Sequence, residues 1–345
     1  MKTLILSATL GLALAPAAEI QTKYEPGPGR KVTIESATST KRTIEIEGGG
    51  EIGSGRGGGS MEIERREVHV DHVLAVEDGR PSKVRRHFTD LGGKSASEFG
   101  EMSRESELES PWEGVTLELV ADGADVEARV KEGKEPTVEG ALEGHRLELF
   151  LDAFLPKGPV EPGTEWELAD AAIRRGLRLD LQRKLFPPPE VPEGEGRGGG
   201  GGRRGGGNRP GGGDSLLTQS EWKGSAKLVG AEEKAGANCY VVEIEVETSG
   251  EREIQGGFGG RRGGSLEPAF ENRMTWSAKL QGKLWFDVSN RRPMLLELEG
   301  SLKEESIREM ERQGQTLRTR STGSGTIDYR VEVEDAPALD AKSAK

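Results

Sequence analysis

The chain has 345 residues, of which 33% are hydrophobic, 31% are charged and 51 are glycine. Its 60 acidic residues outnumber its 48 lysines and arginines, so the formal net charge at pH 7 is −12. Because phosphate backbones and anionic lipids repel a net anion, this balance argues against nucleic acid or a membrane surface as a partner of the whole chain.

The first residues have the three-part order of a secretory signal peptide. Lys2 is followed by an uncharged run from Thr3 to Leu14, and then by small residues up to Ala18. The run is shorter than the ~20 apolar residues that span a bilayer as a helix. A buried N-terminal strand or helix is the alternative. We therefore expect residues 1–18 to be a signal peptide cleaved after Ala17 or Ala18, and the mature chain to be periplasmic or extracellular without a membrane span.

Alternating apolar residues predict strands in the segment that follows. Val68, Val70, His72, Leu74 and Val76 share one phase, and a tight Asp-Gly turn at residues 78–79 leads into the next strand. A second hairpin is predicted across residues 122–123 by the same reasoning. The N-terminal half is therefore expected to be rich in β structure.

Two segments of this half have helical spacing. Residues 144–155 place Leu147, Phe150, Leu151 and Phe154 at i, i+3, i+4 and i+7. Residues 170–186 carry a second apolar stripe, with Asp170 as the expected N-cap. We expect these helices to cover the sheets. The Pro/Gly-punctuated segment between them ends at Trp166, which we expect to be anchored.

Three segments are dense in glycine: residues 48–60, 194–213 and 256–264. Such segments cannot recover their ordering entropy by burying side chains, so we expect loops or linkers. The middle one follows three consecutive prolines, which end a helix. Residues 187–215 are therefore the predicted linker or loop between an N-terminal half, 19–186, and a C-terminal half, 216–335. Residues 336–345 are predicted to be a disordered tail.

The C-terminal half has the clearest periodicity. Apolar or small residues occupy every second position from Met274 to Val288, and only Trp285 breaks the polar phase. Together with the flanking segments, this pattern predicts five or six long antiparallel strands between residues 220 and 334. The expected fold class is mainly β (α+β), with long curved antiparallel meander sheets in two β-rich halves and a few helices that cover them.

Two phrases carry a family resemblance: LPKGPVEPGTEW at residues 155–166 and GKLWFDVSNRRP at residues 282–293. With the signal peptide and the glycine-rich insertions, they resemble exported bacterial β-rich proteins of a family without an assigned function, over residues 150–335. The resemblance implies export and β architecture. It assigns no catalytic residue, because that family supplies none.

Cys239 is the only cysteine, so no intrachain disulfide can form. We interpret it as a small buried hydrophobe at the start of a strand rather than a reactive thiol. His69 and His72 form the only histidine cluster, but on a strand an offset of three residues points side chains to opposite faces. The alternation predicts His72 at the edge of the core, and His69 in solvent with Asp71. No metal site is expected there.

Three other motifs lack the spacing or the composition that their function would require. Gly93-Lys94-Ser95 ends like a phosphate-binding loop, but Phe88 occupies the position of its first glycine. The acidic turn at residues 122–125 lacks the spacing of a calcium loop. The Arg-Gly segments resemble nucleic-acid-binding tracts, but they carry few arginines and one aromatic residue. The sequence therefore assigns no catalytic, cofactor-binding or metal-binding residue, and no cofactor.

Three function classes follow from compartment and architecture. The first is a non-enzymatic exported envelope or extracellular protein that binds a partner, such as another envelope component, or an apolar small molecule in the concavity of its sheet. The second is a hydrolase that uses a pair of carboxylates outside the cytoplasm. The third is an assembly component whose Gly/Arg loops contact its neighbours.

Overall fold

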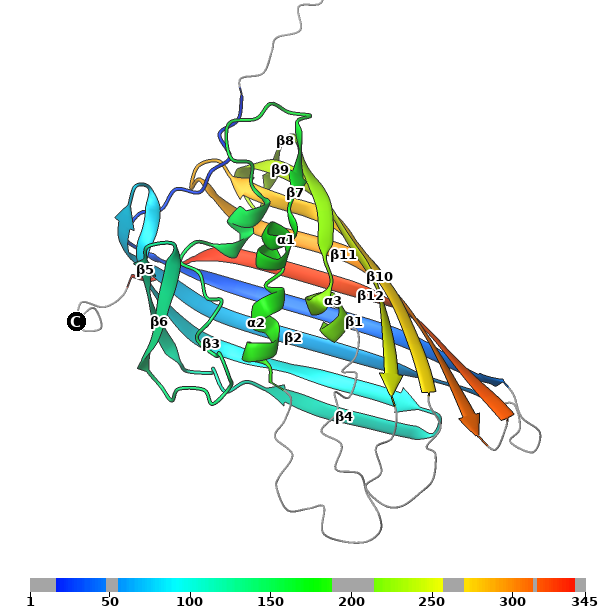
Figure 1. Ribbon diagram of the computed structural model, residues 1–345. Helices are drawn as coiled ribbons and strands as arrows, with labels where there is room; N and C mark the ends of the chain where they lie inside the picture. The colour runs from blue at the N-terminus through cyan, green and yellow to red at the C-terminus, as the bar shows by residue number, and fades with distance from the viewer. Residues whose placement is uncertain (1–16, 48–54, 188–213, 257–269, 313–314, 339–345) are drawn as a thin grey trace, which may run out of the picture.

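Figure 1 shows the computed structural model, which describes residues 17–47, 55–187, 214–256, 270–312 and 315–338. The predicted signal peptide lies outside the described residues except for Ala17 and Ala18. The glycine-rich segment 194–213 also lies outside them, as do most of the segments 48–60, 256–264 and 336–345.

The described residues form one twelve-stranded antiparallel sheet with the order β6-β5-β3-β2-β1-β12-β11-β10-β9-β8-β7, and β4 pairs with β3. The first six strands are β1 (Gly29–Glu47), β2 (Gly55–Glu77), β3 (Arg80–Phe99), β4 (Met102–Glu109), β5 (Thr116–Asp122) and β6 (Asp125–Glu132). The others are β7 (Glu165–Leu168), β8 (Trp222–Lys234), β9 (Ala237–Gly256), β10 (Phe270–Asp287), β11 (Arg292–Arg312) and β12 (Gln315–Ala336). The predicted mainly β fold is confirmed.

The first and the last long strands are neighbours. β1 pairs with β12 along its whole length, from Gly29 opposite Ala336 to Glu47 opposite Arg318. Strands from both parts of the chain therefore belong to one continuous sheet, while β8 to β12 form the predicted meander. The sheet has no break between β1 and β12. The division of the chain into an N-terminal and a C-terminal half therefore remains a prediction.

Short helices cover one face of this sheet: the 3₁₀ helix η1 (Phe150–Phe154) and the α-helices α1 (Asp170–Gly176), α2 (Leu179–Leu185) and α3 (Asp214–Gln219). Figure 1 shows α1, α2 and α3 together on that face, which we call the inner face. The predicted period-two strand is β10, and its Ala278, Leu280, Leu284 and Phe286 are buried on the inner face in the main core. The helices thus supply the cover that a sheet with one apolar face requires.

Trp285, which breaks the polar phase of β10, is also buried. It forms a small separate cluster with Cys239, Val241 and Leu295. Its indole Nε1 donates to Glu232 Oε1 with an N···O distance of 2.5 Å. The outer face, opposite the helices, therefore has a local apolar cluster of its own at this end. The prediction that Cys239 is a buried residue at the start of a strand is confirmed.

The predicted helices are shorter than expected. Residues 144–155 form only η1, and Gly144 at the start of this segment has a left-handed φ of 84°. The segment 170–186 divides into α1 and α2 at Arg178, whose φ is 54°. Asp170 is not an N-cap. Its carboxylate accepts a hydrogen bond from the backbone N–H of Trp222 at 2.8 Å, which ties α1 to β8.

Glycines let the long strands approach and bend. A Cβ at Gly282 would lie 1.9 Å from the carbonyl oxygen of Glu297, and one at Gly325 would lie 2.0 Å from that of Ser39. Both glycines are at positions that face the inner side of the sheet, where bending brings neighbouring strands close together. The expectation that residues 48–60 form a loop is wrong for residues 55–60, which belong to β2 and pair with β1, because strand hydrogen bonds need no side chain.

Candidate functional site

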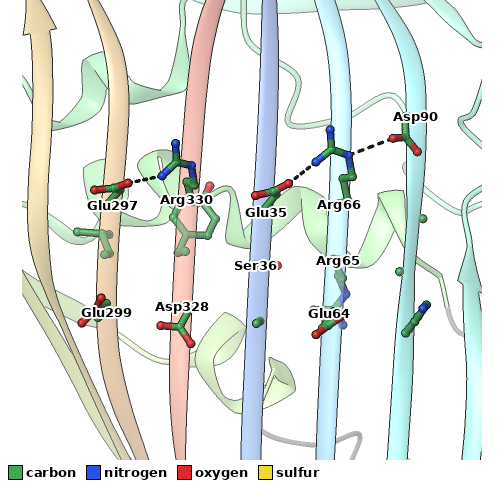
Figure 2. Close-up of a pocket in the computed structure, with 16 residues that line it drawn as sticks. Glu35, Ser36, Glu64, Arg65, Arg66, Asp90, Glu297, Glu299, Asp328 and Arg330 are labelled. Carbon is green, nitrogen blue, oxygen red and sulfur yellow. Dashed lines mark hydrogen bonds and ion pairs between the residues drawn. The ribbon is translucent and has the colours of Figure 1, made fainter. Parts of the chain in front are cut away.

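A hollow of about 760 Å³ lies on the outer face, across the centre of the sheet. Figure 2 shows it with the helices behind the strands. One row of charged side chains crosses its upper part in this order: Glu297 (β11), Arg330 (β12), Glu35 (β1), Arg66 (β2) and Asp90 (β3). The registers of the sheet create this row, because Arg330 is the direct partner of both Glu297 and Glu35, and Glu35 is also opposite Arg66.

Ion pairs join the members of this row. Arg330 pairs with Glu297, and Arg66 pairs with Glu35 and, at 3.1 Å, with Asp90. All of these side chains are at least one third exposed, so each pair contributes only ~0–1 kcal/mol to stability. The row neutralises most of its own charge.

The next row on the same face is different. Glu299, Asp328, Ala37 and Glu64 follow one another across β11, β12, β1 and β2, two residues along each strand from the first row. Glu299, Asp328 and Glu64 are exposed, and no other described residue forms a hydrogen bond or an ion pair with their carboxylates. Figure 2 shows Glu299 and Asp328 side by side. Lys94 of β3 is opposite Glu64 and also lines the hollow, but it forms no ion pair with Glu64. Three carboxylates thus face one lysine in this row, and this part of the hollow has an excess of negative charge.

A second hollow of about 570 Å³ continues this one. Glu297 and Glu299 line both, and the second hollow adds Glu165, Glu243, Glu245, Lys227 and Lys283 from β7, β8, β9 and β10. We call the two hollows together the outer groove. It crosses the sheet from β3 to β7, and strand spacing of ~4.8 Å gives it a length on the order of 35–40 Å.

The clefts between α2 and the sheet are much smaller than this outer hollow. Two clefts between α2 and the sheet hold about 40 and 20 Å³. Leu177 and Leu179 from the helices and Leu280 and Ile327 from the strands line the larger of the two. Pockets for small molecules measure roughly 300–1,000 Å³. Helix side chains thus occupy the part of the concavity where we expected an apolar ligand.

The polar phase of β2 faces inward near the helices, contrary to expectation. His69 is fully buried, and Asp71 is only 6% exposed. The prediction that both are solvated is wrong, because arginines of other elements approach them. Arg178 donates to Glu67 at 2.6 Å, and Arg86 donates to both oxygens of Asp71 at 2.7 Å. The alternation along β2 indicated that the strand has an apolar and a polar face, but it did not show that α2 covers the polar face.

These contacts control protonation. Burial alone raises the pKa of the Glu67 carboxyl, but Arg178 and His69 reverse that effect and hold the pKa at about 2. His145 is wedged between Phe88 and Trp112, with ring centroids 6.2 and 5.4 Å away. Burial, followed by the charges of Arg86 and Arg178, lowers the pKa of His145 to about 3. Neutral His145 therefore packs as an aromatic residue.

One carboxyl group stands out by its raised pKa. Burial raises the pKa of Asp152 to about 6, although its oxygens accept hydrogen bonds from the hydroxyls of Thr22 and Tyr24. These hydrogen bonds tie Asp152, and with it η1, to the segment before β1. A glycosidase-type hydrolase needs two carboxyls across a cleft. The contacts of Asp152 are those of a structural group, and the hydrolase alternative stays a prediction.

The remaining sequence candidates lie in ordinary structural positions. Gly93, Lys94 and Ser95 belong to β3, and residues 122–125 form the turn between β5 and β6 with exposed aspartates. Trp166 is anchored by its indole Nε1, which donates to the carbonyl of Phe154 at 3.2 Å. Within the described ranges, no group of three or more histidine, cysteine, aspartate or glutamate side chains is arranged to hold a metal ion.

Comparison with known proteins gives no family. No protein-family model matches the chain, and no curated protein matches its sequence. A DUF1329 family protein from Desulfovibrio piger aligns at 7% identity over 90% of this chain and 89% of that chain, with a TM-score of 0.12. Pseudomonas aeruginosa OpdQ aligns at 7% identity over 88% and 98%, with a TM-score of 0.13.

The toluene transporter TodX of P. putida aligns at 8% identity over 89% of this chain and 90% of that chain, with a TM-score of 0.12. TM-scores this low mean that the alignments do not superpose one fold on the other, so they carry no argument about this chain. Among the described residues, no helix is both long and apolar enough to cross a bilayer.

Proposed function

We propose that this chain is an exported binding protein that holds an extended, positively charged partner in its outer groove. The observation that carries the proposal is the row Glu299, Asp328 and Glu64, three exposed carboxylates without partners among the described residues, at the centre of the largest hollow. The groove as a whole has nine carboxylates against five lysines and arginines that point to the outer face. A cationic partner would neutralise this excess.

The shape of the groove supports an extended partner. Its length on the order of 35–40 Å matches about ten residues of extended chain at ~3.3 Å each. The hollow is open along one side, and the aliphatic parts of its side chains offer apolar contact between the charges. A flexible peptide or polymer with spaced cations fits this geometry better than a compact apolar molecule does.

Export is supported by the order of residues 1–18, and the structure shows what each predicted cleavage position would remove. Ala18 is only 3% exposed, and its backbone N–H and C=O bond to Val160 at 2.7 and 3.0 Å. Cleavage after Ala17 would leave this bridge in the mature chain, whereas cleavage after Ala18 would remove it. The signal peptide and the periplasmic or extracellular location are part of the proposal.

The apolar-ligand version of the binding hypothesis is the second candidate, and the clefts of about 40 and 20 Å³ argue against it. Native mass spectrometry with lipid extraction of the exported protein separates the two. A clean mass without a co-purifying lipid is the expected result. A stoichiometric apolar molecule would replace the outer-groove proposal with ligand carriage.

The direct test uses a fluorescent peptide of ten lysines as the probe. The double variant Glu299→Lys and Asp328→Lys reverses two unpaired charges at the groove centre, and we expect it to weaken binding by ~10-fold or more at low salt. The matched control is Asp122→Lys with Asp125→Lys, which makes the same charge change in the exposed β5–β6 turn. Equal binding of peptide by both double variants would disprove a role for the groove.

A further inference from the structure

A third hollow, of about 380 Å³, lies on the inner face. It is bounded by α1, the start of α2, residues 144–150 and Arg86 of β3. Figure 1 shows α1 and α2 on this face of the sheet, whereas the outer groove lies on the opposite face (Figure 2). The two sites are therefore separate.

Arginine dominates this hollow, which we call the arginine pocket. Its lining includes Arg86, Arg146, Arg174, Arg175 and Arg178. Arg86 and Arg178 are buried, Arg174 is half-buried, and Arg146 and Arg175 are exposed. The guanidinium groups thus extend from the floor of the pocket to its rim, in a chain whose net charge is −12.

Of the three carboxylates of the lining, Asp170 and Asp180 have partners, whereas no described residue forms a hydrogen bond or an ion pair with Glu148. Asp180 accepts a hydrogen bond from Arg174, at 2.5 Å. Asp170 accepts the N–H of Trp222. Glu148, the third carboxylate of the lining, is half-buried. Below the floor, Asp71 and Glu67 pair with Arg86 and Arg178.

Donors remain after this pairing. No described residue accepts a hydrogen bond from, or forms an ion pair with, the guanidinium groups of Arg146 and Arg175. The buried Nη2 of Arg178 also has no hydrogen-bond partner, although the side chain is only 5% exposed. A buried guanidinium nitrogen without an acceptor is unfavourable unless a ligand or ordered water supplies one.

The backbone directs Arg178 into this position. Its φ of 54° is left-handed, an unfavourable conformation for a residue with a side chain, and it separates α1 from α2. The guanidinium carbon lies 5.1 Å from the ring centroid of Phe150, so the ring supports the floor of the pocket. The break in the predicted helix is what places this arginine between helix and sheet.

The charges around His145 agree with the excess of arginine here. Burial is the main cause that lowers the pKa of His145, Arg86 and Arg178 lower it further, and Glu67 acts in the opposite direction. The two buried arginines thus disfavour an added proton at His145, and an anion near them would be favoured.

We propose that the arginine pocket binds a phosphate group, either as a free phosphate compound or as the headgroup of an anionic phospholipid. A guanidinium group can donate two parallel hydrogen bonds to two oxygens of one phosphate. Arg146 and Arg175 at the rim, which have no partner among the described residues, can contact a phosphate that the buried arginines attract. A pocket of about 380 Å³ accommodates a phosphate or pyrophosphate group but not lipid chains. This inference goes beyond the proposed function, because it concerns the other face and the opposite ligand charge.

The experiment compares the mature wild-type chain with the double variant Arg146→Gln and Arg175→Gln. Both side chains are exposed, so the change leaves the buried pairs intact. The control is Arg80→Gln with Arg183→Gln, two exposed arginines outside the pocket and with the same change in net charge. Isothermal titration with inorganic pyrophosphate at constant ionic strength is one arm, and flotation with phosphatidylglycerol vesicles against phosphatidylcholine vesicles is the other.

We expect saturable binding in one arm, weakened at least ~10-fold in the pocket variant and unchanged in the control. Binding of pyrophosphate identifies a free phosphate compound as the ligand. Binding of phosphatidylglycerol vesicles alone identifies a headgroup. Absence of binding in both arms, or an equal loss in the control, would overturn the proposal. The pocket variant should bind the lysine peptide normally, so this failure and failure of the outer groove are distinguishable.

Discussion

On the outer face, Arg66 and Arg330 form their ion pairs in a row that is open to water. On the inner face, Arg86 and Arg178 form the same kind of pair with Asp71 and Glu67, but all four residues are less than 10% exposed. The ion pairs on the two faces have the same chemistry, but they differ in their exposure to water. Water screens the outer pairs and replaces a lost partner, whereas a buried charge that loses its partner is left in a medium of low polarity.

The largest expected effect tests this difference directly. Arg86→Ala should destabilise the protein by ~3–5 kcal/mol, because it leaves the carboxylate of Asp71 buried without its bidentate partner. Arg66→Ala on the outer face removes one arginine with two acidic partners and should change stability by only ~0–1 kcal/mol. Urea denaturation followed by circular dichroism measures both. Similar losses in the two variants would show that burial does not separate the two faces.

A second test concerns the curvature that gives the sheet an inner and an outer face. Gly282→Ala should destabilise the protein by ~1–3 kcal/mol, because the new methyl group would meet the carbonyl of Glu297. Gly158→Ala is the control, since nothing lies within 4 Å of a Cβ there. Thermal unfolding compares them. A neutral Gly282→Ala would mean that the strands have room to flatten.

An effect of similar size depends on pH. The folded pKa of Asp152, about 6, lies above the ~3.9 of an unfolded aspartate, so folding favours its protonated form. The stability that this adds is present below pH ~4 and is lost as the pH rises through about 6.

Asp152→Asn removes this dependence. The variant should gain ~1–3 kcal/mol relative to wild type when unfolding is measured at pH 7.5 instead of pH 4. Asp122→Asn, in the exposed β5–β6 turn, is the comparison variant. A stability difference between Asp152→Asn and wild type that stays constant with pH would show that Asp152 does not take up a proton on folding.

The alternation of side chains was enough to predict the strands, but it did not predict which polar residues are buried. The alternation from Met274 to Phe286 predicts β10 and its buried face correctly, because period two depends only on the geometry of one strand. The same reasoning placed His69 and Asp71 in solvent. Their burial depends on Arg86 of the next strand and on Arg178 between α1 and α2, and no periodicity within β2 carries information about either.

The residues of both candidate sites also could not be predicted from local sequence patterns. The acids of the outer groove come from β1, β2, β3, β7, β9, β11 and β12, and only the pairing of β1 with β12 brings Glu64 and Asp328 to opposite sides of Ala37. The arginine pocket joins Arg86 to residues 144–181, and it depends on the left-handed turn at Arg178. No short motif contains either set, so no spacing rule could have found them.

The sequence by itself determined that this chain forms long antiparallel strands with helices to cover them, because side-chain alternation and turn residues act within a few residues of one another. Only the tertiary structure decided which charges are solvated and which are buried. That outcome depends on the register between strands far apart in the chain and on where short helices dock, and both are set by the packing of the whole sheet.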